Sequence, residues 1–162
     1  AGTIVGDMGL NGGVNTLTVE GDANTAVTGG VFDTGGQLTI NVTGGKLSVT
    51  NTQGLDSLSN PTELIAAKAV NVGASGVLVV GADPQAQGGA GQNTHFSTSG
   101  ASTFANGAQI GLTLQSLQLT DHTYTILSTT GGGTLQIGTF GTAIINDAPF
   151  LYTATPSADA SP

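Results

Sequence analysis

The sequence lacks cysteine and tryptophan, and only 7% of its 162 residues are charged, against roughly 25% in ordinary globular proteins. Because cysteine is absent, a disulfide framework, thiol catalysis and a zinc–thiolate site are all excluded. Basic residues are especially few: the chain has two, Lys46 and Lys68, compared with ten acidic residues, and its formal net charge is −8. Nucleic acids and anionic lipids are bound mainly through arginine and lysine, so we expect neither as a partner.

Long apolar runs are also missing, because no stretch approaches the roughly 18 residues that a membrane helix needs. We therefore expect no membrane insertion of this chain. Its first residues, AGTIVGDMGL, lack the basic and apolar regions of a signal peptide. If the protein is exported, we expect the chain to be a processed or excised piece of a longer one. Its length of 162 residues predicts one domain with a real hydrophobic core.

What the sequence does contain is short alternating runs separated by Gly-Gly pairs. Every second residue is apolar in Leu17–Val19, Leu38–Val42 and Leu47–Val49, which places the apolar side chains on one face of an extended segment. Each Gly-Gly pair lets the chain turn sharply, because glycine accepts a positive φ. Short strands that end in glycine corners predict a coil wound from β-strands, a β-solenoid. An antiparallel β-sandwich also has short, regularly spaced strands and is the alternative fold.

The strand pattern is interrupted by an irregular insertion at about residues 52–67. Within it, Asn60-Pro61-Thr62-Glu63 has the asparagine cap, first-position proline and third-position glutamate of a helix start. A loop that leads into the next strand fits these residues equally well, so both interpretations stay open. Glycine, glutamine and alanine in residues 81–93 predict a surface loop. The strands expected around these interruptions are Ala69–Val72, Gly76–Val80, His95–Thr98, Ser102–Ala105, Gln109–Gln115 and Thr123–Ser128, with a bulge or corner near Ser116.

The C-terminal end of the chain differs in composition from the rest. Tyr124, Phe140, Phe150 and Tyr152 are four of the seven aromatic residues. The last coil of a solenoid must cover an otherwise open core, and an aromatic-rich segment suits that role. We therefore expect a β cap after the coils. Residues 156–162 are small and polar and are bounded by prolines, which predicts a frayed tail or a linker.

Residues 123–152, TYTILSTTGGGTLQIGTFGTAIINDAPFLY, resemble the autochaperone region that ends the passenger domain of bacterial autotransporters. The shared pattern is an aromatic and aliphatic strand, a glycine turn, a Gly-x-Phe, and a proline followed by apolar residues. Here these elements are Tyr124–Leu127, Gly131–Gly133, Gly138–Phe140 and Pro149–Tyr152. Upstream, VNVGASGVLVVGADP and FSTSGASTFANGAQIGLTLQSL resemble the strand-and-loop coils that precede this region.

The resemblance implies a right-handed parallel β-helix that is exported through the outer membrane and is displayed at the bacterial cell surface or released. It implies coils over residues 1–120, an autochaperone-like cap over 121–155 that nucleates folding during export, and a tail over 156–162. In the family the passenger continues into a membrane barrel, so this chain resembles a passenger fragment without its translocator. The cap and folding residues that the resemblance assigns are Tyr124, Ile126, Leu127, Phe140, Pro149, Phe150 and Tyr152.

Few residues suggest acid–base catalysis or calcium binding. Glu20 and Asp22 are two residues apart and would share a face of a strand, as clustered carboxylates do in β-helix enzymes that cleave acidic polysaccharides. However, the chain has no arginine to bind a uronate carboxylate, and Glu20-Gly21-Asp22 lies where a strand should turn, which favours a solvated turn. Asp33 lies between two glycine pairs in GGVFDTGG, which lacks the full nine-residue calcium repeat.

The two histidines, His95 and His122, are expected at the surface beside strands. Asp121 adjoins His122, but serines are too common here to identify a nucleophile, and no G-x-S-x-G elbow is present. Asn41-Val42-Thr43 spells a glycosylation sequon, which threonine-rich strands produce easily by chance. We therefore predict no catalytic, cofactor-binding or metal-binding residue.

Three functions are consistent with the sequence. The first, which we predict, is an extracellular structural or adhesive module in surface display, adhesion or biofilm, with a host or matrix glycan or protein as its partner. The second is a self-assembling filament subunit that stacks head to tail through the solenoid ends. The third is a polysaccharide-active β-helix enzyme, whose activity would depend on Glu20 or Asp22.

Overall fold

The computed structural model describes an all-β protein. The described residues are 2–10, 12–33, 35–49, 63–85, 92–117, 120–142, 144–146 and 155–157. Within these ranges the regular structure consists of strands and contains no helix. The described residues therefore include no helix that could cross a membrane.

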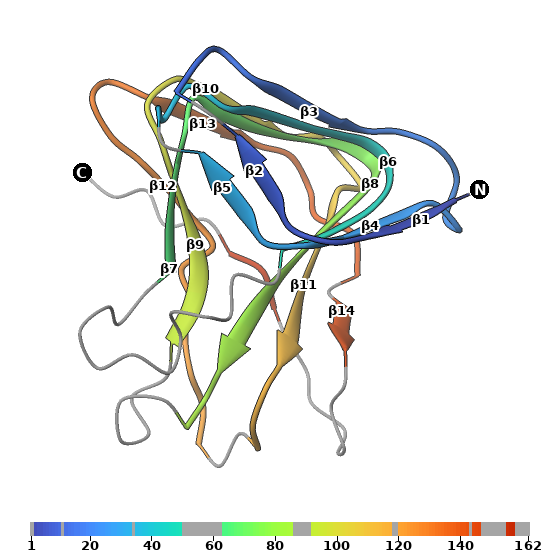
Figure 1. Cartoon of the computed structure of the whole chain (residues 1–162). Coiled ribbons are helices and arrows are strands. Elements are labelled where there is room, and N and C mark those ends of the chain that lie inside the picture. Colours follow the sequence, from blue (N-terminus) through green and yellow to red (C-terminus); the bar gives the residue numbers. More distant parts are fainter. Residues whose placement is uncertain are drawn as a thin grey trace.

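Fourteen strands lie in the described ranges (Figure 1). In chain order they are β1 (Thr3–Val5), β2 (Met8–Leu10), β3 (Thr16–Val19), β4 (Ala26–Gly29), β5 (Val31–Asp33), β6 (Thr39–Val49), β7 (Glu63–Ala67), β8 (Ala69–Asp83), β9 (Gln92–Thr98), β10 (Ala101–Phe104), β11 (Gln109–Leu114), β12 (Leu127–Thr129), β13 (Thr134–Ile137) and β14 (Ile144–Asn146). The strands β6 and β8 are the longest, with 11 and 15 residues, because each continues from one set of partners to another.

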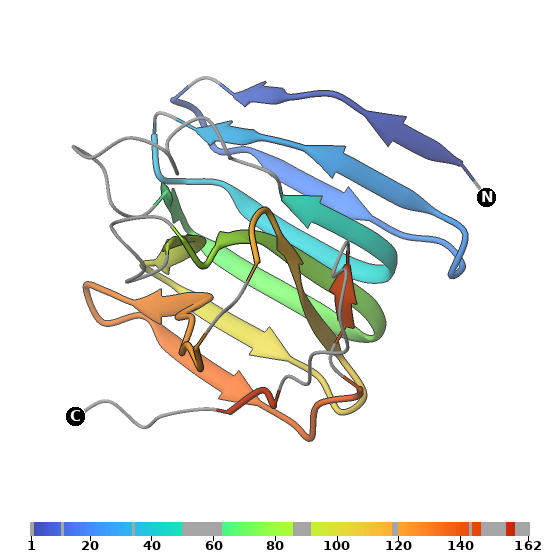
Figure 2. The same cartoon turned by 90° about the horizontal axis from the view of Figure 1, so that it is seen from below.

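Strands that are far apart in the sequence lie side by side in three columns (Figures 1 and 2). The first column contains β1, β4, the C-terminal parts of β6 and β8, β11 and β14. The second contains the pair β2 and β5 and the set β7, β9 and β12, with β5 in contact with β7. The third contains β3, the N-terminal parts of β6 and β8, β10 and β13. The chain visits the columns in turn, so each pass adds a strand to every column.

Pairing within the columns is parallel. In the first column Thr3 pairs with Ala26, and Ala26 pairs with Lys46 on the next pass. The one antiparallel pairing in the described part of the chain joins residues 82–83 of β8 to residues 92–93 of β9. The antiparallel sandwich is therefore wrong. The mostly parallel, open sheet is compatible with the predicted solenoid.

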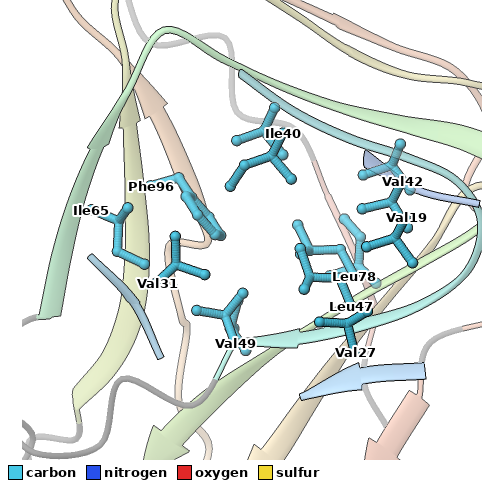
Figure 3. Close-up of a cluster of buried hydrophobic side chains, with 14 of the residues drawn as sticks. Val19, Val27, Val31, Ile40, Val42, Leu47, Val49, Ile65, Leu78 and Phe96 are labelled. Carbon is cyan, nitrogen blue, oxygen red and sulfur yellow. The ribbon is translucent and has the colours of Figure 1, made fainter. Parts of the chain in front are cut away.

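Apolar side chains from all three columns meet in one core between them (Figure 3). In the third column Val19, Val42, Val72 and Phe104 lie in register on successive strands. Each of these four side chains is at most 3% exposed. Burial of one such side chain stabilises the fold by about 1.5–3 kcal/mol, so the rows of aliphatic residues explain why alternating runs recur along the sequence.

Glycine at the corners lets successive passes approach closely. A Cβ atom on Gly29 would collide with the carbonyl oxygen of Gly6, and one on Gly44 would collide with that of Gly21. Gly45 has a φ of 70°, in the left-handed region that other residues rarely adopt. Gly36 and Gly45 therefore have the positive φ predicted for a Gly-Gly turn. Gly29 and Gly44 lie within strands, where the missing side chain permits backbone contacts between passes.

The structure corrects the interpretation of residues 52–67 where it describes them. Glu63–Ala67 form the strand β7, so both the helix and the loop are wrong for these residues, while 52–62 lie outside the described residues. The reason is pairing with β9, which buries every second side chain. Ile65 and Ala67 are 4% and 2% exposed, whereas Leu64 is 54% exposed, and this two-residue alternation is that of a strand.

Most other strand predictions are confirmed, with shifted ends. The two strands predicted between residues 69 and 80 are one continuous strand, β8, and β9, β10 and β11 cover the next three. The predicted loop 81–93 is shorter, because its first and last residues belong to β8 and β9. The strand predicted at 123–128 is only partly right, since β12 begins at Leu127. A corner does follow β11, which ends at Leu114.

Candidate functional site

The predicted cap residues lie partly within the described structure. Tyr124, Ile126, Leu127 and Phe140 are described, whereas Pro149, Phe150 and Tyr152 lie outside the described residues. The described four belong to the pass in which β12 pairs with β9 and β13 pairs with β10. We call it the last pass, because it is the last one that the described residues contain in all three columns.

Three of these residues attach the last pass to the pass before it. The ring of Phe140 packs edge-on against Phe104, with ring centroids 5.9 Å apart and an interplanar angle of 71°. Leu127 pairs with Phe96, and the backbone N–H of Phe96 donates a 2.8 Å hydrogen bond to the carbonyl of Ile126. Edge-on aromatic pairs contribute about 0.5–1.5 kcal/mol beyond their buried area. These contacts extend the core into the last pass.

Tyr124 has a different environment. Its ring stacks on that of His122 with centroids 5.8 Å apart. Its hydroxyl is buried and has no hydrogen-bond partner in the described part of the chain. Burial raises the pKa of the phenol to about 12, and the carboxylate of Asp83 adds to the shift. A phenol with this pKa stays protonated at neutral pH and is a poor general base.

A polar contact joins two passes at the corner that follows β8. The Ser116 hydroxyl donates a hydrogen bond to the carboxylate of Asp83, 33 residues away in the sequence. The backbone N–H of Gln85 donates to Asp83 Oδ1 at 3.0 Å and to Ser116 Oγ at 3.1 Å. The side-chain amide of Gln85 donates to the carbonyl of Leu117 at 2.7 Å. The sequence predicts the corner near Ser116, but it does not reveal this partner.

The carboxylates singled out in the sequence lie in turns or beside them. Glu20 and Asp22 are exposed between β3 and β4, where the solvated-turn interpretation places them. Asp22 Oδ1 accepts hydrogen bonds from the backbone N–H of Asn24 at 2.9 Å and from the Thr25 hydroxyl at 3.4 Å, an arrangement that stabilises a turn. The carboxylate of Asp33 accepts the backbone N–H four residues further on at 3.1 Å. Among the described residues, no three histidine or acidic side chains are grouped so as to hold a metal ion.

The two histidines belong to separate contacts. His95 Nε2 lies 2.8 Å from the Ser128 hydroxyl on the neighbouring strand. Burial lowers the pKa of His95, so its ring is neutral at pH 7. His122 Nε2 lies 3.3 Å from the Thr120 hydroxyl. The structure therefore does not bring His95 and His122 together at one serine.

The third column carries polar contacts on its outer side that no sequence motif marks as a site. The side-chain amide of Asn71 donates a 3.0 Å hydrogen bond to Asn41 Oδ1, and the backbone N–H of Thr103 donates to Asn71 Oδ1 at 3.1 Å. The three residues lie in register on β6, β8 and β10. Asn41 is the first residue of the sequon, and its side chain is held within a strand. The alternation of polar residues is visible in the sequence, but their alignment between strands depends on the register.

Comparison with protein-family models, with curated proteins and with solved structures gave no significant match.

Proposed function

We propose that the chain is an extracellular structural module, a right-handed parallel β-helix that acts in surface display, adhesion or biofilm formation. The observation that carries the proposal is the repeated passage of the chain through three columns of parallel strands. A stack of this kind is an elongated body with regular side faces, which suits the presentation of a surface to a partner. The resemblance of residues 123–152 to autotransporter passengers supports export through the outer membrane.

The composition is consistent with this role. Two lysines and ten acidic residues in 162 leave hydroxyls, amides and backbone groups as the main polar surface. Buried aliphatic rows and parallel backbone ladders stabilise the fold, and the chain has no cysteine that could form a disulfide. We therefore propose that function resides in the faces of the coil and that the chain is not an enzyme.

Display on living cells tests the proposal. The chain is placed between a signal peptide and an autotransporter barrel in a Gram-negative host, and surface exposure is measured by the access of an added protease. We expect a protease-resistant surface fragment and more biofilm than cells that carry the same barrel behind an unstructured Gly/Ser linker of equal length. Failure to reach the surface, or surface display with no gain in biofilm over the linker control, would overturn the proposal.

Self-assembly into a filament is the second candidate, and an exposed apolar edge favours it. Ile4 and Val5 on β1 are 64% and 77% exposed, and Val14 is 86% exposed. Within the described strands β1 pairs with β4 alone, and the free edge of a strand is a template for pairing with another chain. Electron microscopy of the purified chain decides between the two candidates. Filaments that Ile4→Lys abolishes would support assembly, and monomeric particles at every concentration would rule it out.

A further inference from the structure

Five hydrogen-bonding side chains line up across the outer side of the third column. Pairing places Thr18, Asn41, Asn71, Thr103 and Gln136 in register on β3, β6, β8, β10 and β13. We call these five residues the polar row; the column that carries them runs along the top of Figure 1. The residue before and the residue after each of them point toward the core, as the alternating burial along these strands shows. The polar row therefore lies along the stacking direction of the strands.

The polar row is accessible and partly ordered in advance. Thr18, Thr103 and Gln136 are exposed, and the two asparagines are half-buried. Hydrogen bonds from Asn71 to Asn41 and from Thr103 to Asn71 fix the amide groups at the centre of the row. Side chains that are already ordered lose less conformational entropy when a ligand binds. Neighbouring strands are about 4.8 Å apart, so five strands give a row roughly 19 Å long.

The chemistry of the polar row limits what it can bind. The row carries no charge of its own, and the protein has a net charge of −8. An anionic polymer would therefore be repelled by the protein, and no residue of the row is a cation that could attract it. The row also has no aromatic residue and no arginine, the side chains that anchor most protein–protein interfaces. What it offers is a line of hydroxyl and amide groups, which can both donate and accept hydrogen bonds.

We propose that the polar row binds a neutral, extended polysaccharide that runs along the stacking direction of the strands. The hydroxyls of such a polymer both donate and accept, and they recur with every sugar ring, whose length is close to the distance between strands. Many weak hydrogen bonds along the row then supply the affinity that an aromatic or arginine side chain supplies in other interfaces. The inference rests on the proposed adhesive function, for which it names the contact face and the class of partner.

Affinity electrophoresis tests this inference, because the negative charge carries the protein into a native gel. Its mobility is measured in plain gels and in gels cast with hydroxyethyl cellulose, with dextran or with alginate. We expect one or both of the neutral polymers to retard the protein, and alginate, which is anionic, to leave its mobility unchanged. No retardation by either neutral polymer, or equal retardation by alginate, would overturn the inference.

Paired variants locate the contact. In one, Asn71→Val and Thr103→Val remove two polar groups from the row while keeping strand-forming residues. In the matched control, Thr28→Val and Ser97→Val remove hydroxyls from β4 and β9 in the other two columns. Loss of one hydrogen bond of about 1 kcal/mol weakens binding about fivefold, so the row variant should bind the neutral polymer at least fivefold more weakly. The control variant should bind like the unmodified chain, and equal binding by both variants would contradict the assignment.

Circular dichroism and the melting temperature check that each variant is folded. If the first pair fails to fold, Thr18→Val with Gln136→Leu removes polar groups at the exposed ends of the row instead. Mobility in the plain gel is also measured at several protein concentrations. If it depends on concentration, and the row variant removes this dependence, a second copy of the chain occupies the row and the inference is overturned. A chain that promotes biofilm on cells but binds neither neutral polymer would refute the polysaccharide contact and leave the proposed function standing.

Discussion

Gly29 lies so close to Gly6 on the preceding pass that the Gly6 carbonyl group fills the space where a side chain at Gly29 would begin. We expect Gly29→Ala to destabilise the protein by about 1–3 kcal/mol, the usual cost of forcing a methyl group into a packed region, and to lower the melting temperature by several degrees. Gly9→Ala is the matched control, because a Cβ atom there has no atom within 4 Å. Equal melting temperatures for the two variants would show that the passes are not in this close contact.

The aromatic contact between Phe104 and Phe140 should be measurable as a coupling energy. Phe104 is buried at 3% exposure, and Phe140 packs edge-on against it from the last pass. In a double-mutant cycle with Phe104→Leu and Phe140→Leu, we expect a coupling of about 0.5–1.5 kcal/mol in the free energy of unfolding. Chemical denaturation supplies the four free energies. Purely additive effects would mean that residues near 140 are not attached to the core by this pair.

The stability of the protein should fall in alkaline solution because of Tyr124. Burial, with Asp83 as a second cause, raises the pKa of this phenol from 10.0 to about 12 in the folded state. The unfolded chain therefore loses the proton first, and the free energy of unfolding decreases as the pH rises from 10 to about 12. Ultraviolet titration of phenolate absorbance should show one late-titrating tyrosine, and Tyr124→Phe should remove it. Persistence of the late component in Tyr124→Phe would assign it to Tyr152, the other tyrosine in the chain.

A second pH effect, in acid, is expected from His95. Burial lowers its pKa below 6.5 in the folded state, so between these values the unfolded chain binds more protons. The free energy of unfolding therefore falls as the pH drops below 6.5, and His95→Gln should remove this part of the dependence. Ser128→Ala tests the cause. Burial, not the hydrogen bond to Ser128, lowers the pKa of His95, so nuclear magnetic resonance titration should still find a low pKa in this variant. A return of the pKa to its ordinary value would contradict burial as the cause.

The sequence contains much of the information needed to predict the strands. Alternation in Leu38–Val42 marks a strand because burial on one face requires every second residue to be apolar, and β6 confirms it. In Glu63–Ala67 the same alternation is weak, since alanine occupies two of the five positions, and a local helix-start motif competes with it. Pairing with β9 decides the structure there, and no local pattern records that pairing.

The contact between Asp83 and Ser116 and the polar row are harder to predict from the sequence. Their residues come together only through the register of the paired strands. Asp83 and Ser116 lie 33 residues apart and come into contact only once β8 and β11 are paired. The polar row has the same origin: each member is an ordinary polar residue on the outer side of a strand, and the alignment of five of them follows from the number of residues in each pass. Loop lengths set that number, and loops of unequal length hide the repeat from a search for a fixed period.

The buried serine Ser102 offers a last test of how the passes are held in register. It is fully buried and lies in register with Leu135 on β13. Its hydroxyl accepts the backbone N–H of Val70 at 3.1 Å and donates to Thr98 Oγ1 at 3.3 Å. A buried donor left without a partner costs about 1–3 kcal/mol, so Ser102→Ala should destabilise the protein by that amount even though alanine is the more apolar residue.

Amide hydrogen exchange gives the local measurement for this variant. In Ser102→Ala the amide of Val70 loses its acceptor, so we expect it to exchange faster relative to the amides of its neighbours on β8 than it does in the unmodified chain. Ser97→Ala is the control, because Ser97 lies on the outer side of β9 and its loss should change stability by less than about 0.5 kcal/mol. If Ser102→Ala were as stable as the control and the Val70 amide stayed equally protected, the hydroxyl would not be the acceptor that joins these two passes.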